Sequence, residues 1–242
     1  MTPIFRDRID HPMAWRGRDL SKEEISFDLS QRHAAALKDV LLKIRKAGLL
    51  LGEIRAEHCR HPALDDDLER AFVEIQEGRG IVIVRGLPVD RHSVGDISTM
   101  FWALGTHFGR GVSQSALGDL LGQVRDETPA GQPESARGYL SRRELSLHVG
   151  LAQIVRLMCV RQACRGGYSR YASGLAVHNE ILATRPDLIP ILYRGFPYHR
   201  RGEEASTRSP FAKIAEQQSL WSEWLPVSKR RRHRAERAFQ SA

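Results

Sequence analysis

The hydrophobic pattern of this 242-residue chain changes near residue 107, and that change constrains the fold more than any other feature. Before it, long stretches place apolar residues at helical spacing. After it come short apolar or alternating runs, separated by turn-rich segments such as "TPAGQPES". Such runs are typical of antiparallel strands. We therefore expect a sheet in the middle of the chain, built from "LLGQVRD", "ELSLHV", "IVRLMCVRQA" and "YSRYAS".

Four helices are expected from periodicity and from their stop signals, at residues 31–48, 64–78, 94–107 and 173–196. The first is the clearest, because Leu37, Val40 and Ile44 share one face and a glycine follows the last turn. The last is interrupted by Pro186, which cannot donate a helical hydrogen bond. Between the second and third helices, "GIVIVRGLP" is rich in β-branched residues and predicts a buried strand.

Most of the basic charge lies near the C-terminus. The formal net charge is +8, and "KRRRHRAER" at residues 229–237 contributes +5, which leaves +3 for the rest. A charged chain end is typical of a solvated tail, so nucleic-acid binding is the less favoured interpretation. The sequence has neither an apolar run of about 18 residues nor a signal-peptide pattern. We expect a cytoplasmic chain that does not enter a membrane.

Several clusters of reactive residue types have structural explanations. "EHCRH" holds Glu57, His58, Cys59 and His61, but side chains so close in sequence cannot all converge on one ion, and no partner cluster follows. Cys159 lies in an apolar run and is expected to be a buried small hydrophobe. Three cysteines do not indicate a disulfide framework. The "RGG" glycines predict a hairpin turn, and no nucleophile-elbow pattern supports a hydrolase.

His148 is the most informative candidate, because it closes the apolar run "ELSLH". A facial triad for iron needs a histidine and a carboxylate two residues apart at a strand end, plus a second histidine from a later strand. Here the second position is Gly150. The residues alone therefore leave two alternatives, a metal ligand and a packed histidine.

Four longer stretches, in one order, resemble the TauD/TfdA family of Fe(II)/2-oxoglutarate-dependent dioxygenases. The resemblance runs from about residue 5 to residue 204 and is carried by "GRGIVIVRGLPVDR", "FWALGTHFGRGVSQSALGDLLGQVRD", "LHVGLAQIVRLMCVRQACRGGYSRYAS" and "AVHNEILATRPDLIPILYRGFPYHRRGE". It implies an α+β fold, in which helices flank a double-stranded β-helix, the cupin-like jelly-roll. The implied domains are an N-terminal helical extension at 1–78, a partial jelly-roll at 79–205, and a divergent, disordered basic tail at 206–242.

The resemblance also implies a site. The family holds Fe(II) with a His-x-Asp/Glu pair and a distal histidine, binds 2-oxoglutarate on the metal, and anchors it with an arginine near that histidine. On this pattern His148 is the first iron ligand. Gly150 occupies the position at which the family has its metal-binding carboxylate, so that ligand is missing here. Gln114, Arg125 and Asp126 fall in the stretch that the family places near cofactor and substrate.

The distal histidine and arginine have no clear counterpart. Nothing after Glu204 resembles that part of the family. His233 and Arg237 have suitable chemistry, but their highly charged segment predicts no strand to position them. We therefore expect the roll to be incomplete at its C-terminus, and open sheet edges would favour self-association.

Two functional hypotheses follow. The first is an oxidoreductase that acts on a small molecule with Fe(II) and 2-oxoglutarate, and its halogenase-like variant would bind a halide in the position that Gly150 leaves open. The second is a degenerate, non-catalytic member of the family. Packing and capping explain His178 and Asn179, and His199 belongs to a charged turn.

Overall fold

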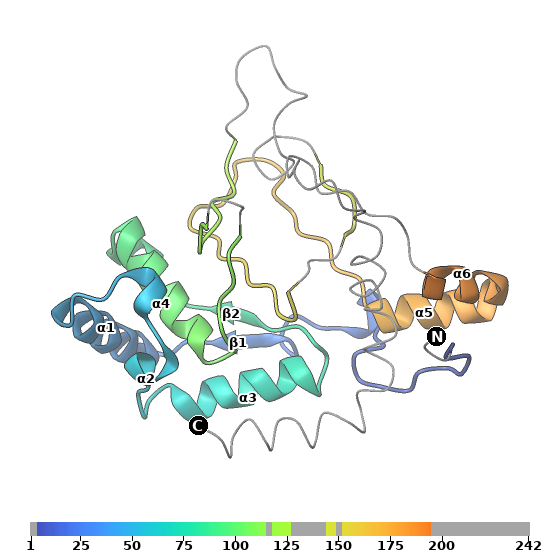
Figure 1. Cartoon of the computed structure of the whole chain (residues 1–242), viewed down its shortest axis with the longest axis horizontal. Coiled ribbons are helices and arrows are strands. Elements are labelled where there is room, and N and C mark those ends of the chain that lie inside the picture. Colours follow the sequence, from blue (N-terminus) through green and yellow to red (C-terminus); the bar gives the residue numbers. More distant parts are fainter. Residues whose placement is uncertain (1–3, 115–117, 127–143, 149–151, 195–242) are drawn as a thin grey trace, which may run out of the picture. The chain divides into compact units, whose positions relative to one another are not determined.

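The computed structural model describes residues 4–114, 118–126, 144–148 and 152–194 (Figure 1). The chain divides into two compact units, one of residues 15–172 and one of residues 1–14 with 173–242. In the described part of the larger unit, the elements are η1 (Gly17–Asp19), β1 (Ser26–Asp28), α1 (Gln31–Lys46), η2 (Leu51–Glu53), α2 (Ala56–Cys59), α3 (Asp65–Gln76), β2 (Ile83–Arg85), η3 (Val89–Arg91) and α4 (Val94–Thr106).

Helix α1 confirms the first predicted helix and forms the centre of the core. Ser30 caps its N-terminus, where the Ser30 hydroxyl accepts a hydrogen bond from the His33 amide at 3.4 Å. Such caps satisfy backbone donors that the first helical turn leaves unpaired. The buried side chains of α1 pack in a cluster with residues of α2, α3 and α4. That cluster consists of Leu29, Ala36, Leu37, Val40, Leu41, Ile44, Ile54, Cys59, Leu64, Leu68, Met100, Trp102, Ala103 and Leu104.

Helices α3 and α4 confirm the second and third predicted helices. Three aspartates occupy the first turn of α3, where the helix dipole favours negative charge. Ser93 caps α4 by accepting a hydrogen bond from the Asp96 amide at 3.2 Å. Ile97 and Met100 are buried on the face of α4 that meets the core. Both helices are therefore held by the apolar stripe that their periodicity predicts.

The strand predicted at 80–88 is shorter and more exposed than expected. Only Ile83–Arg85 is a strand, and it pairs in parallel with β1, which periodicity did not predict. Ile83 and Val84 are each 40% exposed, so the prediction of a buried strand is wrong. The sheet has two strands in the described part of the chain. A sheet of two three-residue strands is too small to be buried on both faces, which explains the exposure of β2.

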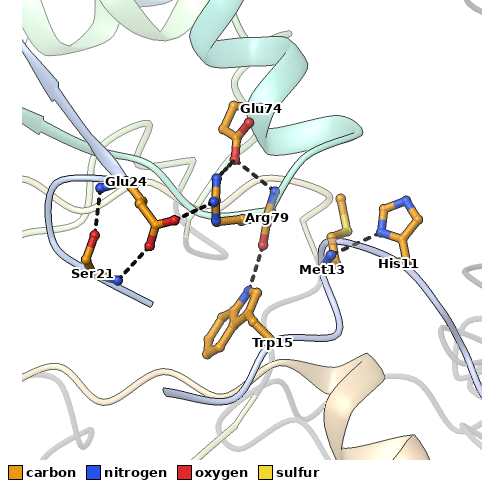
Figure 2. A network of polar contacts seen from close by, with 7 residues as sticks. All are labelled: His11, Met13, Trp15, Ser21, Glu24, Glu74 and Arg79. Carbon is orange, nitrogen blue, oxygen red and sulfur yellow. Dashed lines mark hydrogen bonds and ion pairs between the residues drawn. The ribbon is translucent and has the colours of Figure 1, made fainter. Parts of the chain in front are cut away.

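A polar network around Arg79 fastens the segment before β1 to the end of α3 (Figure 2). The Arg79 guanidinium contacts Glu24 at 2.9 Å and Glu74 at 3.3 Å, and the Trp15 indole N–H donates to the Arg79 carbonyl at 2.8 Å. The Ser21 amide donates to the Glu24 carboxylate at 2.9 Å. That hydrogen bond and, to a smaller extent, Arg79 lower the pKa of Glu24.

The antiparallel sheet predicted for the middle of the chain is not formed by the described residues there. Residues 118–126, 144–148 and 152–172 contain no strand. Leu147, Val155 and Leu157 are more than 60% exposed, although their alternation predicts one buried face. The physical reason is that alternation creates only the possibility of a buried face, whereas a strand also needs a ladder partner and a covering layer. The jelly-roll expectation therefore has no direct counterpart in these segments.

Two local expectations in the same region have different outcomes. Cys159 is exposed, so its interpretation as a buried small hydrophobe is wrong. The error has the same cause, since the described residues around Cys159 form no sheet that could receive a covering layer. Gly166 and Gly167 have φ values of +73° and +69°, as a tight turn requires. The turn geometry is present, but no paired strands flank it in the described residues.

The smaller unit confirms the interrupted helix near the end of the described chain. Its elements are α5 (Gly174–Thr184), η5 (Pro186–Leu188) and α6 (Ile189–Arg194). The Asn179 side chain exchanges two hydrogen bonds of 2.8 Å with the backbone of Ile9, and the ring of buried His178 packs 6.0 Å from that of Phe5. These contacts support the structural roles predicted for His178 and Asn179. No helix among the described residues is both long and apolar enough to span a bilayer.

Candidate functional site

His148 is exposed and has a defined ring orientation. Its Nδ1 lies 2.7 Å from the carbonyl oxygen of Ser146. Because a carbonyl oxygen only accepts hydrogen bonds, this contact assigns the ring proton to Nδ1. In the neutral ring, Nε2 then carries the lone pair. Histidines that bind metals commonly donate their second ring nitrogen to a carbonyl or carboxylate in this way. His148 can therefore act as a nitrogen ligand.

The described residues do not complete a metal centre around His148. They contain no group of three or more His, Cys, Asp or Glu side chains arranged to hold an ion. Gly150 lies outside the described residues, as do His199, His233 and Arg237, and glycine carries no side-chain donor in any conformation. A single exposed imidazole is a poor site for Fe(II), whose retention depends on ligand number and geometry. The donor set described here does not fit the iron centre of the family.

Gln114, Arg125 and Asp126 lie in the irregular segments that follow α4, and all three are exposed. The Gln114 side chain donates to the Val112 carbonyl at 2.8 Å, and its backbone amide donates to the Asp119 carbonyl at 2.6 Å. These contacts order the loop around Gln114. The role of the three residues toward cofactor or substrate stays a prediction.

The ligand-rich "EHCRH" segment has the structural role that the sequence predicts. Cys59 is buried at the end of α2. The His58 ring accepts a hydrogen bond from the Arg55 amide at 3.0 Å, and the His61 ring accepts one from the Ala63 amide at 3.1 Å. Each imidazole thus satisfies nearby backbone, which explains the residue types without an ion.

Two buried groups beside this segment have pKa values that burial moves. Burial lowers the pKa of His107, the residue that ends α4, and the Asp65 carboxylate 3.8 Å away opposes the effect. Burial likewise raises the pKa of the Cys59 thiol. Both groups are uncharged in the folded chain near neutral pH. Cys59 belongs to the buried cluster of the larger unit, and the side chain of His107 is 4% exposed.

A third polar group joins α1 to α3. The His33 ring receives a hydrogen bond from the Ser30 amide at 2.9 Å on Nδ1 and donates from Nε2 to the Asp67 carboxylate at 2.7 Å. His33 is buried, and its hydrogen bond is the largest cause of the lowered pKa of Asp67. Sequence analysis missed this link because the two residues lie 34 positions apart.

Arg156 is a polar residue that the sequence did not single out. It lies in the run "IVRLMCV", where the only charged side chain is its own. Its guanidinium donates to the Phe101 carbonyl at 3.0 Å and stands 4.9 Å from the centroid of the Phe101 ring. An arginine inside an apolar run was the signal available in the sequence.

Comparison with known proteins identifies the family of the chain, which the geometry of the described residues does not show. A model of the family described as "Taurine catabolism dioxygenase TauD, TfdA family" matches residues 46–238. The match covers most of the chain and continues past Glu204, where the resemblance noted in the sequence ends. Members of this family are generally dioxygenases that depend on iron and 2-oxoglutarate.

Two curated relatives agree with this match. FR-33289 synthase of Streptomyces rubellomurinus is 23% identical over 212 residues, covering 87% of this chain and 62% of the relative. Taurine hydroxylase-like protein SAT17 of Stachybotrys chartarum is 29% identical over 194 residues, covering 76% of this chain and 50% of the relative. The chain thus spans between half and two thirds of the length of these relatives. It belongs to the TauD/TfdA family of dioxygenases.

Proposed function

We propose that the chain is an oxidoreductase of the Fe(II)/2-oxoglutarate-dependent kind that acts on a small molecule. The family match over residues 46–238 carries this proposal. One relative's name supports a small substrate, since that protein is called taurine hydroxylase-like. We further propose a jelly-roll, incomplete within this chain, with domain limits near residues 78 and 205.

His148 is the proposed metal ligand of this enzyme. Its support is chemical: Nδ1 lies against a carbonyl oxygen and so carries the proton, which leaves the lone pair of the neutral ring on Nε2, and the residue is exposed. When bound, an Fe(II) ion with 2-oxoglutarate would supply the oxidising chemistry of the family. The described residues provide no carboxylate beside His148, so further ligands must come from other parts of the chain or from outside it.

Gly150 favours a halogenase-like variant of the same proposal. A carboxylate two residues after His148 would occupy one position on the metal and add a negative charge. Glycine leaves that position to a water molecule or a halide. A chloride ion would replace the missing charge, so chloride should strengthen the binding of metal with 2-oxoglutarate only while residue 150 lacks a carboxylate.

A non-catalytic family member is the second candidate. The observation that favours it is the donor set, in which one exposed histidine is joined by no other group of ligands among the described residues. In that case the chain would keep the fold of the family without retaining iron. Self-association through exposed apolar segments would then be its more important property.

Anaerobic titration separates the two candidates. Purified chain would receive Fe(II) and 2-oxoglutarate, with visible absorption from metal-to-ligand charge transfer as the binding readout and succinate release on adding oxygen as the activity readout. The proposed enzyme predicts both signals in the wild-type chain. His148→Ala should abolish them, while His92→Ala, in a loop of the larger unit, should leave them unchanged.

The chloride arm tests the variant. We expect chloride to lower the apparent Kd for 2-oxoglutarate in the wild-type chain and to have no effect in Gly150→Asp. If neither absorption nor succinate is produced under any of these conditions, the enzyme proposal is wrong and the non-catalytic candidate stands. Equal responses of wild type and Gly150→Asp to chloride would reject the halogenase-like variant alone.

A further inference from the structure

Cys159 and Cys164 are two exposed thiols in one irregular segment of the larger unit. Four residues separate them, in the sequence "CVRQAC". Residues 152–172 contain neither helix nor strand, so neither thiol lies in an element that packs on the core. The third cysteine, Cys59, is 1% exposed within the buried cluster around α1. Two of the three thiols are therefore open to solvent, and the third is not.

The backbone around the two exposed thiols changes direction twice. It bends at residues 160–161, between the thiols, and again at residues 164–165. The second turn is tight, since a Cβ atom built at Gly167 would lie 3.4 Å from the Cβ of Ala163. A fully extended chain would hold Cα atoms five residues apart at a separation of about 16 Å, and the bend between the thiols shortens it. The two thiols are therefore closer than an extended segment would hold them.

Joining the two sulfur atoms leaves the packed core unchanged. A disulfide needs its two Cα atoms about 4.4–6.8 Å apart. Every residue from 159 to 172 is exposed and lies outside helices and strands, so closing the loop breaks no backbone ladder and displaces no buried side chain. A partner thiol on such a short loop acts at an effective concentration of about 1 mM. The cost of the bond therefore falls on the loop alone.

We propose that Cys159 and Cys164 are a reversible redox site, at which hydrogen peroxide converts the two thiols into a disulfide. In the first step one thiol sulfur bonds to a peroxide oxygen as the O–O bond breaks, which gives a sulfenic acid and one water molecule. The second thiol then attacks the sulfenic sulfur, the S–S bond forms, and the sulfenic oxygen leaves as a second water molecule. Two thiols are oxidised, one peroxide is reduced, and a dithiol reverses the bond by exchange.

Burial sets Cys59 apart from this chemistry. The thiolate is the form of cysteine that reacts, and burial raises the pKa of the Cys59 thiol. The same burial keeps an oxidant away from its sulfur atom. The redox site goes beyond the proposed function, since neither Cys159 nor Cys164 is assigned to the metal or to a substrate. Oxidation of the pair therefore needs no iron.

The positions of the arginines allow a direct test. Trypsin cleaves after Arg156, Arg161 and Arg165, so the two thiols fall in separate peptides, LMCVR and QACR. The reduced full chain, with a chelator to remove metal, would be treated with hydrogen peroxide, alkylated, digested and analysed by mass spectrometry. We expect the two peptides to be joined, two of the three thiols to be lost, and dithiothreitol to restore both.

Three variants identify the reacting pair. In Cys159→Ser and in Cys164→Ser the remaining exposed thiol has no neighbour to attack it, so its sulfenic acid should persist and take up more of a dimedone probe than wild type does. The matched control is Cys59→Ala, which keeps both exposed thiols and should form the joined peptides as fully as wild type. At a chain concentration of about 10 µM, the effective concentration of about 1 mM favours the bond within one chain about a hundredfold over a bond between chains.

Three results would overturn the proposal. They are peptides that stay separate after peroxide treatment of the wild-type chain, a bond that joins Cys59 to either exposed thiol, and chains linked to one another as the main product. Joined peptides in wild type and in Cys59→Ala, with none in either serine variant, would support it. Circular dichroism of each variant separates a change in reactivity from loss of fold. Failure of the iron and succinate assay would leave this result untouched, because no metal is present.

Discussion

The link between α1 and α3 through His33 gives a quantitative prediction. His33→Ala removes three contacts of the ring, the 2.9 Å hydrogen bond that His33 accepts from the Ser30 amide, the 3.1 Å contact with the Ser30 hydroxyl, and the 2.7 Å bond that it donates to the Asp67 carboxylate. Ser30 is exposed, so water can replace both contacts with Ser30, and their net value is at most about 1 kcal/mol. The bond to Asp67 is partly buried and involves a charged group, and such a bond is worth about 1.5–3 kcal/mol. The free energy of unfolding should fall by about 2–4 kcal/mol.

Urea denaturation of the full chain, followed by tryptophan fluorescence, measures this loss. Asp67→Ala and the double variant complete a thermodynamic cycle, from which we expect a coupling of about 1.5–3 kcal/mol between the two side chains. Ser30→Ala should cost about 1 kcal/mol, because it removes the cap and the contact of the Ser30 hydroxyl with the His33 ring but leaves the bond to Asp67. Arg70→Ala removes an exposed ion pair to Asp67 and should cost less than about 1 kcal/mol.

Amide hydrogen exchange adds a local readout. The first turn of α1 should exchange faster in His33→Ala than in wild type, while amides in α5 should not change. A coupling near zero, or equal losses from His33→Ala and Ser30→Ala, would show that the bond to Asp67 contributes nothing and would refute the reasoning.

Three further predictions concern the same unit. Leu68→Ala, at a side chain 1% exposed, should cost about 2–5 kcal/mol by denaturation, whereas Val73→Ala on the exposed face of α3 should change stability by about 0.5 kcal/mol or less. Burial lowers the pKa of His107 below 6.5, so between the folded pKa and 6.5 the unfolded chain binds more protons than the folded chain. Thermal stability should therefore fall as the pH drops through 6.5 and level off below the folded pKa. A pH profile that is unchanged in His107→Gln would contradict this. Gly86→Ala should lower the melting temperature, since Gly86 has φ of +85° and a Cβ there would press on the Leu29 carbonyl; equal melting temperatures would show that the turn adapts.

The helices of the larger unit could be predicted because their signals are local. Helical spacing of Leu37, Val40 and Ile44 marks the buried face of α1, and capping residues such as Ser93 mark the starts of helices. Each signal involves residues within about one or two helical turns of each other. The interruption at Pro186 is local in the same sense, since one residue removes a backbone donor.

Strand pairing could not be predicted in the same way. The partner of β2 is β1, whose three residues carry no alternation long enough to detect and lie more than fifty positions earlier. The alternating run around Val155 and Leu157 shows the opposite error, since a clear pattern there lacks a partner in the described structure. A strand is stabilised by residues outside its own sequence, whereas an amphipathic helix already satisfies most of its own backbone.

In the candidate site, too, the sequence indicates contacts between neighbouring residues but not contacts between distant ones. The ring orientation of His148 depends on Ser146, two residues away, and makes the nitrogen available to a metal. Whether iron stays bound depends on donors that sequence spacing does not locate, because the acid expected at residue 150 is glycine.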